Sequence, residues 1–538
     1  YKAVDTVVGI GIFGYCTNAT IKNLVVENIN VSGHQNVGGV VGKAVNTTIE
    51  NCVVTGSLGG SSGNAYVGGV AGTLIDGSIS NCLSAASISG NYNIAAGIAA
   101  DGTGTLSNSY SYSTITGSGT TCGVSGGPSS SNCYWVTEKF SGSDSSGAQG
   151  DTLSNVIDTV NNWSGWTKGA DNYINSGSDK RTHEITLPYP TSAGMPDSLK
   201  LRTNEFNFVT EVDDSGNLTR EWKEYTSITS ADEFQNINNA LAGNYVLEND
   251  ITLPASWNAI AGTSGYMFTG CFEGNGHTIT IGASSSDLNS TLVPFFNNGG
   301  VIHNLKAAGS VEVSTYFGSI VSYNGIGGYV INCSSTADIT STGSGNVGGI
   351  VAANYGTVYG CQFSGSTSGS GSYYGGIAAQ NYGKLTNSVN TADISGYATV
   401  GGIAGNNGNS SINATISNCL NAGNITATGS AAGGIAGGNY DGSTIDSCLT
   451  SGKVKCTGAT SPSALGGITP INYGTITNTY MDLGQFSGEG VGESNTTAKL
   501  NDDYAQYPWN LKNKMSGWNA FNITSDKTTG KKRALTYT

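Results

Sequence analysis

Two short motifs decide the fold of this chain: Val400-Gly-Gly-Ile-Ala-Gly405 and, after it, Ile416-Ser-Asn-Cys419. The first motif recurs with small changes at residues 37–42, 67–72, 347–352, 374–379 and 432–437. The second motif, an apolar residue followed by any residue, Asn and Cys, recurs at Ile49-Glu-Asn-Cys52 and Ile79-Ser-Asn-Cys82. Internal copies of this kind indicate a fold built from one repeated structural unit.

The residue that follows the Asn marks the register of the repeat. Within each half of the chain, successive markers are separated by 24 to 31 residues. This period, with short alternating apolar stretches and no 3.6-residue pattern, is typical of a β-solenoid with one coil per repeat. We therefore predict an all-β fold, a right-handed parallel β-helix in two tandem modules. The twelve markers are Leu24, Cys52, Cys82, Ser109 and Cys133, then Leu305, Cys333, Cys361, Ser388, Cys419, Cys448 and Thr479.

Ladders of like residues explain the repeated residue types. Stacked parallel strands place equivalent side chains about 4.8 Å apart, so each inward position packs against its own copy in the next coil. Small residues or thiols at the marker position suit a narrow interior corner. The Asn before the marker is expected to bridge coils through its amide and to adopt a left-handed backbone, as at Asn51, Asn81, Asn332 and Asn418. Paired glycines allow tight bends and close approach of backbones.

Interruptions of the repeat divide the chain into a first module at 1–190, a connector at 191–225 and a second module at 226–538. The first array is followed by an aromatic-rich segment with Leu153, Val156, Ile157 and Val160 at helical spacing. A similar segment, from Tyr480 to Trp518, follows the second array. We expect both segments to cover the open end of a solenoid.

The second module also has a lead-in that the first module lacks. Ser230-Ala-Asp-Glu233 is a capping box and predicts a helix over about 231–242. Asn244 to Ile251 reads as a strand, and Asn275-Gly276 predicts a hairpin turn closed by His277. For the first module, either the chain is a piece of a longer polypeptide or a neighbouring molecule supplies the covering.

Composition excludes several classes of protein. The 538 residues include 81 Gly but only 9 Pro, and no Gly-X-Y period, which excludes collagen. An apolar content of 37% is too high for a disordered chain. The 22 basic and 36 acidic residues give a net charge of −14 without a basic stripe, which argues against nucleic acid as a partner. No run approaches the roughly 18 to 20 apolar residues that a membrane span needs.

The pattern resembles the GLUG-repeat proteins, a family of Gly-rich β-helix repeats found in bacterial surface adhesins and beside the catalytic domain of some IgA-cleaving metallopeptidases. The resemblance rests on Val-Gly-Gly-Ile-Ala-Gly followed by apolar-x-Asn-Cys, and on the lead-in 268–277, and it covers about residues 7–135 and 226–481. It implies an extracellular, surface-attached and largely non-catalytic role.

Candidate catalytic, cofactor-binding and metal-binding residues do not emerge from the sequence. The only His-Glu pair, His183-Glu184, lacks the second His of a zinc peptidase motif. The adjacent acid pairs Asp213-Asp214 and Asp502-Asp503 lie outside the coils, and acids within the coils do not recur at one position. We therefore expect no enzyme activity, no cofactor and no metal site in this chain.

Cysteine chemistry has two interpretations. The seven cysteines on the marker position are expected to be reduced thiols that fill space in the interior. They are Cys52, Cys82, Cys133, Cys333, Cys361, Cys419 and Cys448. Adjacent rungs nonetheless lie within the separation that disulfides accept. Cys16, Cys122, Cys271 and Cys456 lie off the ladder and are better candidates for pairing.

Two hypotheses of function follow. The first is a non-enzymatic, extracellular cell-surface protein with a structural or adhesive role, whose partners are copies of itself, other surface proteins, or a host or substrate surface. Self-assembly into an envelope layer, sheath or filament belongs to this hypothesis. The second is a glycan-binding or glycan-cleaving β-helix. Tyr355, Tyr382 and Tyr440 follow Asn at one coil position, where they would stack on sugars or pack a turn.

Overall fold

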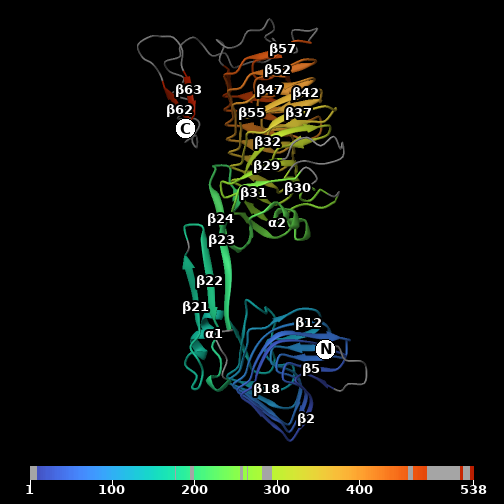
Figure 1. Cartoon of the computed structure of the whole chain (residues 1–538), viewed down its shortest axis with the longest axis vertical. Coiled ribbons are helices and arrows are strands. Elements are labelled where there is room, and N and C mark those ends of the chain that lie inside the picture. Colours follow the sequence, from blue (N-terminus) through green and yellow to red (C-terminus); the bar gives the residue numbers. More distant parts are fainter. Residues whose placement is uncertain are drawn as a thin grey trace. The chain divides into compact units, whose positions relative to one another are not determined.

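The computed structural model describes residues 9–175, 177–193, 199–254, 258–262, 265–281, 294–458, 465–481, 521–524 and 534–537. The chain divides into two compact units, Tyr1–Asn204 and Glu205–Thr538. The division falls inside the segment 191–225 that the sequence predicts as a connector. Each unit contains a parallel β-solenoid (Figure 1). No helix among the described residues is long and apolar enough to cross a membrane.

One coil of the first unit consists of β5 (Asn36–Gly38), β6 (Val41–Val45), β7 (Thr48–Glu50) and β8 (Val53–Ser61). The next coil repeats this plan, and the two pair in parallel with Val37 opposite Val67 and Ile49 opposite Ile79. The stacked coils form three sheets. The four-stranded sheet contains β2 (Phe13–Thr17), β6, β10 (Ala71–Ile75) and β13 (Ala99–Gly102). The five-stranded sheet contains β3 (Thr20–Lys22), β7, β11 (Ser78–Ser80), β14 (Thr105–Ser107) and β18 (Ser129–Ser131). The eleven-stranded sheet contains β1 (Gly9–Ile10), β4 (Val25–Gly33), β5, β8, β9 (Tyr66–Gly68), β12 (Leu83–Ala96), β15 (Tyr110–Ser111), β16 (Thr114–Ile115), β17 (Ser118–Cys122), β19 (Tyr134–Val136) and β20 (Gln149–Asp151).

The predicted helix after the first array is α1 (Leu153–Val160), and its four buried residues are Leu153, Val156, Ile157 and Val160. Thr152 caps it by accepting a hydrogen bond from the Asn155 N–H. The apolar face of α1 packs with Val53, Leu83 and Tyr110, which belong to three successive coils. The helix therefore covers the side of the stack. Trp135 and Phe140 belong instead to the interior cluster of the unit.

After α1 the first unit continues with β21 (Ala170–Asn175), β22 (Lys180–Thr186) and the 3-10 turn η1 (Thr191–Ala193). β21 and β22 form an antiparallel hairpin. The predicted connector also contains regular structure, because β23 (Lys200–Val212) spans the division between the units and pairs antiparallel with β24 (Leu218–Glu224) from Glu205 onward.

The second unit stacks its coils into four sheets, visible as the yellow to orange ladder in Figure 1. The ten-stranded sheet contains β25 (Thr226–Ile228), β26 (Asn244–Leu247), β28 (Cys271–Glu273), β31 (Val301–His303), β35 (Tyr329–Ile331), β40 (Thr357–Tyr359), β45 (Lys384–Thr386), β50 (Thr415–Ser417), β55 (Thr444–Asp446) and β60 (Thr475–Thr477). The seven-stranded sheet contains β30 (Phe295–Asn298), β34 (Val321–Asn324), β39 (Val351–Asn354), β44 (Ala378–Asn381), β49 (Ala404–Asn407), β54 (Gly438–Asn439) and β59 (Ile471–Asn472).

The six-stranded sheet contains β33 (Phe317–Gly318), β38 (Val347–Gly348), β43 (Tyr373–Gly375), β48 (Thr399–Gly401), β53 (Ala431–Gly433) and β58 (Leu465–Gly466). The fourteen-stranded sheet contains β27 (Ile251–Thr252), β29 (Thr278–Ile281), β32 (Lys306–Val313), β36 (Ser334–Ser335), β37 (Asp338–Ser341), β41 (Gln362–Phe363), β42 (Ser366–Gly369), β46 (Val389–Asn390), β47 (Asp393–Gly396), β51 (Leu420–Asn421), β52 (Ile425–Ala427), β56 (Leu449–Thr450), β57 (Val454–Cys456) and β61 (Tyr480–Met481). A separate antiparallel pair consists of β62 (Phe521–Thr524) and β63 (Ala534–Tyr537).

The Gly-Gly pairs stand between neighbouring sheets, where the coil turns. A Cβ on the second glycine of a pair would meet the carbonyl oxygen of its copy in the next coil. The distance is 2.1 Å from Gly349 to the Gly376 oxygen and 2.2 Å from Gly402 to the Gly434 oxygen. These glycines are required by the close approach of backbones, and they do not need a left-handed conformation. The isoleucine after each pair is buried in the interior, as at Ile350, Ile377 and Ile403.

The lead-in of the second unit begins with α2 (Ala231–Asn236), which continues as the 3-10 turn η3 (Ile237–Asn239). The helix starts where the capping box predicts but ends before residue 242. The prediction of a hairpin at Asn275-Gly276 was wrong. β28 and β29, on either side of this turn, pair with strands of other coils and belong to two different sheets. The Asn-Gly turn is a corner of the coil, because its positive φ angles of 51° and 75° suit any tight change of direction.

Of the aromatic segment predicted to cover the end of the second array, Tyr480 to Trp518, residues 482–518 lie outside the described residues.

Candidate functional site: a tyrosine face on the second β-solenoid

The asparagines before the marker position have left-handed backbones. The φ angle is 54° at Asn51, 51° at Asn81 and Asn332, and 52° at Asn418. In the first unit the Asn51 Nδ2 donates to the Asn23 Oδ1 over 3.1 Å, which joins one coil to the next. These residues therefore serve the scaffold, since Asn tolerates a left-handed corner better than other residues with a side chain.

The seven marker cysteines are buried in the interior. Each of the seven thiols donates to the carbonyl two residues earlier, as Cys52 does to Glu50 over 3.3 Å. All eleven cysteines are free, including the off-ladder candidates Cys16, Cys122, Cys271 and Cys456. Burial raises the pKa of Cys133 to about 11 and holds the pKa of Cys333 and Cys448 well above the ordinary value. Thiols in this state are poor nucleophiles.

A second asparagine ladder, which the sequence interpretation missed, runs through the interior of the second unit. Each Nδ2 donates to the Oδ1 of the next rung, and all six of these distances are 2.8 Å. The first six rungs are fully buried and the last is partly exposed. The ladder satisfies polar groups in an apolar core and holds successive coils in register. Its rungs are Asn298, Asn324, Asn354, Asn381, Asn407, Asn439 and Asn472.

Tyrosine recurs at the position directly after a rung, and its ring is half-buried at Tyr355, Tyr382 and Tyr440 and exposed at Tyr473. The backbone N–H groups of Tyr355, Tyr382 and Tyr440 donate to the Asn carbonyl of the preceding coil, so the ladder fixes where these side chains emerge. The rings of Tyr355 and Tyr382 lie 4.9 Å apart between centroids. Tyr323 extends the row on one side, at 5.1 Å from Tyr355, and Tyr473 extends it on the other, at 6.2 Å from Tyr440.

The neighbouring six-stranded sheet adds two phenols, because Tyr373 is the first residue of β43 and Tyr316 directly precedes β33. Tyr316 is 54% exposed. We name the surface formed by all seven rings the tyrosine face. Burial raises the pKa of Tyr382, and the nearby phenol of Tyr355 adds to the shift. The pKa of Tyr440 is raised by burial and then by Tyr373, which places Tyr373 near both halves of the row. The tyrosine face consists of Tyr316, Tyr323, Tyr355, Tyr373, Tyr382, Tyr440 and Tyr473.

Amide side chains lie among these rings. The Gln380 Nε2 donates to the Tyr382 hydroxyl over 2.7 Å, and the Gln380 Oε1 accepts from the Asn346 Nδ2 over 2.8 Å. Between Tyr382 and Tyr440 one coil carries Gly408 in place of tyrosine. In that coil Asn406 is only 3% exposed, and its Oδ1 has no hydrogen-bond partner. The row is thus interrupted above an unsatisfied amide oxygen.

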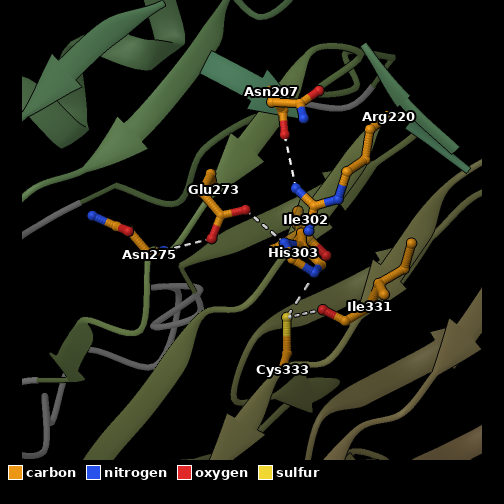
Figure 2. A network of polar contacts seen from close by, with 8 residues as sticks. All are labelled: Asn207, Arg220, Glu273, Asn275, Ile302, His303, Ile331 and Cys333. Carbon is orange, nitrogen blue, oxygen red and sulfur yellow. Dashed lines mark hydrogen bonds and ion pairs between the residues drawn. The ribbon is translucent and has the colours of Figure 1, made fainter. Parts of the chain in front are cut away.

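Another polar cluster lies on the ten-stranded sheet, beneath β23 and β24 (Figure 2). The His303 Nδ1 and the Glu273 Oε2 are 2.5 Å apart, and both side chains are buried. The other oxygen of Glu273 accepts from the Asn275 N–H over 2.8 Å. Phe206, Phe208 and Val209 of β23 pack on the same sheet. In Figure 2 Arg220 of β24 lies above His303, and it donates to the Asn207 carbonyl over 2.9 Å. The apolar contacts of β23 hold the β23–β24 hairpin against this sheet.

The acids and histidines elsewhere in the described residues form no group of three or more that could hold a metal ion. Asp213 binds the backbone and side chain of Asn217 inside a turn, and these hydrogen bonds lower its pKa. His183 pairs with Asp171 at 2.5 Å and stacks on Tyr173. His277 pairs with Asp250. Asp502-Asp503 lie outside the described residues.

Comparison with known proteins supports the repeat assignment. Residues 33–59 match the model of the GLUG motif. These residues carry the Gly38-Gly39 pair and the marker Cys52 and form one coil of the first unit, so the match falls on a single coil of the repeat. A crystal structure described as that of a "putative immunoglobulin A1 protease" from Bacteroides ovatus is similar over 56% of this chain and 90% of that chain, with 19% sequence identity and a TM-score of 0.40. No curated protein sequence matches the chain.

Proposed function

We propose that the chain is a non-enzymatic, extracellular cell-surface protein, in which the β-solenoids form the scaffold and the tyrosine face provides the adhesive surface. One observation carries the proposal. Phenol rings stand at the same position of successive coils and are partly exposed, while the asparagines beneath them are fully used in holding the coils together. Exposed aromatic groups with a polar tip favour contact surfaces.

Adhesion of the full chain to mucin-coated and cellulose surfaces tests the proposal. Replacing Tyr355 and Tyr382 together by Ser should reduce retention by about tenfold or more, because the two rings are the closest pair of the row. Tyr15→Ser is the matched control, since Tyr15 is 54% exposed but belongs to the first unit. Equal retention of the double variant and the parent would contradict adhesion through this face.

The non-enzymatic part of the proposal has its own test. Incubation with soluble polysaccharides should produce no new reducing ends and no unsaturated products. The release of either would show that the solenoid cleaves glycans.

Self-assembly is the structural alternative within the same proposal. A solenoid scaffold could equally serve as a subunit of an envelope layer, sheath or filament. Sedimentation of the purified chain separates the cases. A single monomeric species contradicts self-assembly, and polymers contradict an adhesin that acts alone.

A further inference from the structure

We infer that the tyrosine face binds a neutral, unbranched polysaccharide that runs along the stacking direction of the coils, with its sugar rings over successive phenols. This inference rests on the proposed adhesive function and names the ligand for it. The argument uses the charge of the face, the chemistry of its groups and their repeat distance.

No charged side chain stands at the positions that form the tyrosine face, and the acid closest to it in sequence is Asp441, directly after Tyr440. Three columns of equivalent positions form it, one beginning at Tyr316, one at Tyr323 and one that continues the asparagine ladder outward. Their side chains are phenols, amides, one hydroxyl and small or apolar groups. The first column contains Tyr316, Asn346, Tyr373 and Thr399. The second column contains Tyr323, Ala353, Gln380, Asn406, Gly438 and Ile471. The third column contains Gly325, Tyr355, Tyr382, Gly408, Tyr440 and Tyr473.

A charged polymer would therefore lose hydration on this face without gaining an opposite charge. Burial raises the pKa of Tyr355, Tyr382 and Tyr440, so these phenols stay protonated and uncharged at neutral pH. Nucleic acid also stacks on aromatic rings, but it needs basic side chains along its backbone, and these three columns contain none. A neutral ligand fits the face best.

The groups match the two kinds of surface that a sugar ring offers. A pyranose has apolar C–H faces and a rim of hydroxyl groups. The phenol rings supply apolar surface, while the Tyr hydroxyls and the amides of Gln380 and Asn346 supply donors and acceptors at its edge. The Asn406 Oδ1 is an unsatisfied acceptor that borders Gly438 beside Tyr440.

The regular spacing of equivalent groups along the tyrosine face suits a polymer. Equivalent groups recur once per coil, about 4.8 Å apart, as the 4.9 Å between Tyr355 and Tyr382 shows directly. The row spans the coils from Tyr323 to Tyr473. Contacts repeated along one chain add as linked binding events, so affinity should rise with the length of the polysaccharide until the row is covered.

Affinity gel electrophoresis of the full chain provides the test. Hydroxyethyl cellulose, mixed-linkage β-glucan and mannan are the neutral probes, and carboxymethyl cellulose is the anionic match to the first. We expect at least one neutral polysaccharide to retard the chain, with little change between low and high salt. The double variant Tyr355→Ser/Tyr382→Ser should weaken binding about tenfold or more, while Tyr15→Ser stays within about twofold. Oligosaccharides of the bound polymer should bind more tightly as they lengthen.

The outcomes separate this inference from the proposed function. If the double variant loses adhesion to mucin but no neutral polysaccharide retards the parent chain, adhesion stands and the ligand class is wrong. Binding to carboxymethyl cellulose alone, or binding abolished by salt, also overturns the neutral ligand. A disaccharide that binds as tightly as the polymer overturns the axial placement. If the chain adheres to no surface, both proposals fail. Near-ultraviolet circular dichroism of the variants confirms that each is folded.

Discussion

A single rung of the interior asparagine ladder carries more stability than its size suggests. Asn381 accepts from Asn354 and donates to Asn407, both over 2.8 Å. Asn381→Ala would leave one N–H of the Asn354 Nδ2 and the Asn407 Oδ1 without partners in a buried corner. Each such group costs about 1–3 kcal/mol, so we expect the free energy of unfolding of the second unit to fall by about 2–6 kcal/mol. Urea titration followed by circular dichroism measures this change.

Asn413→Ala is the control for this substitution. Asn413 is exposed and lies in the same unit, so its replacement should change stability by less than about 0.5 kcal/mol. If the two variants unfold at the same urea concentration, the amide chain seen in the structure does not bear on stability.

The buried pair of Glu273 and His303 should behave differently when one or both partners are removed. Glu273→Leu alone leaves a buried His303 without its carboxylate and should cost about 3–5 kcal/mol, because breaking a buried pair strands the other group. The double variant Glu273→Leu/His303→Leu removes both polar groups and should recover most of that loss. A double-mutant cycle in urea measures the coupling. Additive losses in the double variant would show that the pair is not coupled.

At the scale of the element, the second glycine of each Gly-Gly corner leaves no space for a side chain. A Cβ on Gly69 would meet the Gly97 carbonyl oxygen at 2.0 Å and the Ser84 Oγ at 2.2 Å. Because the first of these neighbours is backbone, Gly69→Ala must displace the adjacent coil, and we expect a loss of about 3 kcal/mol or failure to fold. Gly63→Ala, whose Cβ meets only the Asn91 Oδ1 at 3.7 Å, should fold and remain within about 1 kcal/mol of the parent. Thermal unfolding of both variants checks the contrast.

The elements themselves could be predicted where a local signal decides them. The four apolar residues from Leu153 to Val160 define α1, and the Ser230 cap defines the start of α2. The Asn-Gly signal at Asn275 identifies a tight turn but not the strands it joins. A strand in a solenoid pairs with the next coil, some 24 to 31 residues away, so local turn chemistry cannot distinguish a corner from a hairpin.

The candidate site was only partly visible in the sequence. Tyr355, Tyr382 and Tyr440 share the signal of a preceding Asn. That Asn is the interior ladder itself, but the residue type alone does not say whether a side chain points inward. Tyr316 and Tyr373 come from another sheet, and Tyr323 stands one position before its Asn, so only the register of the coils brings them to the same face.

At the scale of the whole molecule, the two units share a motif but not a surface. Alignment of their Gly-Gly pairs places Ala44 and Leu74 of the first unit at the position of Asn354 and Asn381 in the second. The first unit therefore fills this corner with apolar side chains, and the next position carries Val45 and Ile75 in place of tyrosine. A coil therefore forms with either an apolar residue or an asparagine at this corner. The tyrosine face is a property of the second unit, and so adhesion should depend on that unit.

The buried thiols of both units should make the free energy of unfolding fall at alkaline pH. The folded-state pKa of Cys133 is raised by burial from 9.0 to about 11. The folded state thus keeps a proton that the unfolded state loses, so this contribution to stability is complete below pH 9 and disappears as the pH rises to about 11. Across that range one thiol lowers the free energy of unfolding by about 1.4 kcal/mol per pH unit. Cys82, Cys333 and Cys448 act in the same direction.

Urea midpoints measured from pH 8 to pH 11 check this prediction. The midpoint should be level at the acid end of this range and fall steeply above pH 9, and Cys133→Ala should flatten the fall for the first unit because it removes one of the protons that folding retains. Cys456→Ala, which removes a partly exposed thiol from the second unit, controls for the loss of a sulfur atom. The other titratable groups are common to the parent and the variant, so the difference between Cys133→Ala and the parent isolates the thiol. An unchanged slope in Cys133→Ala would mean that the buried ladder can open to solvent without unfolding.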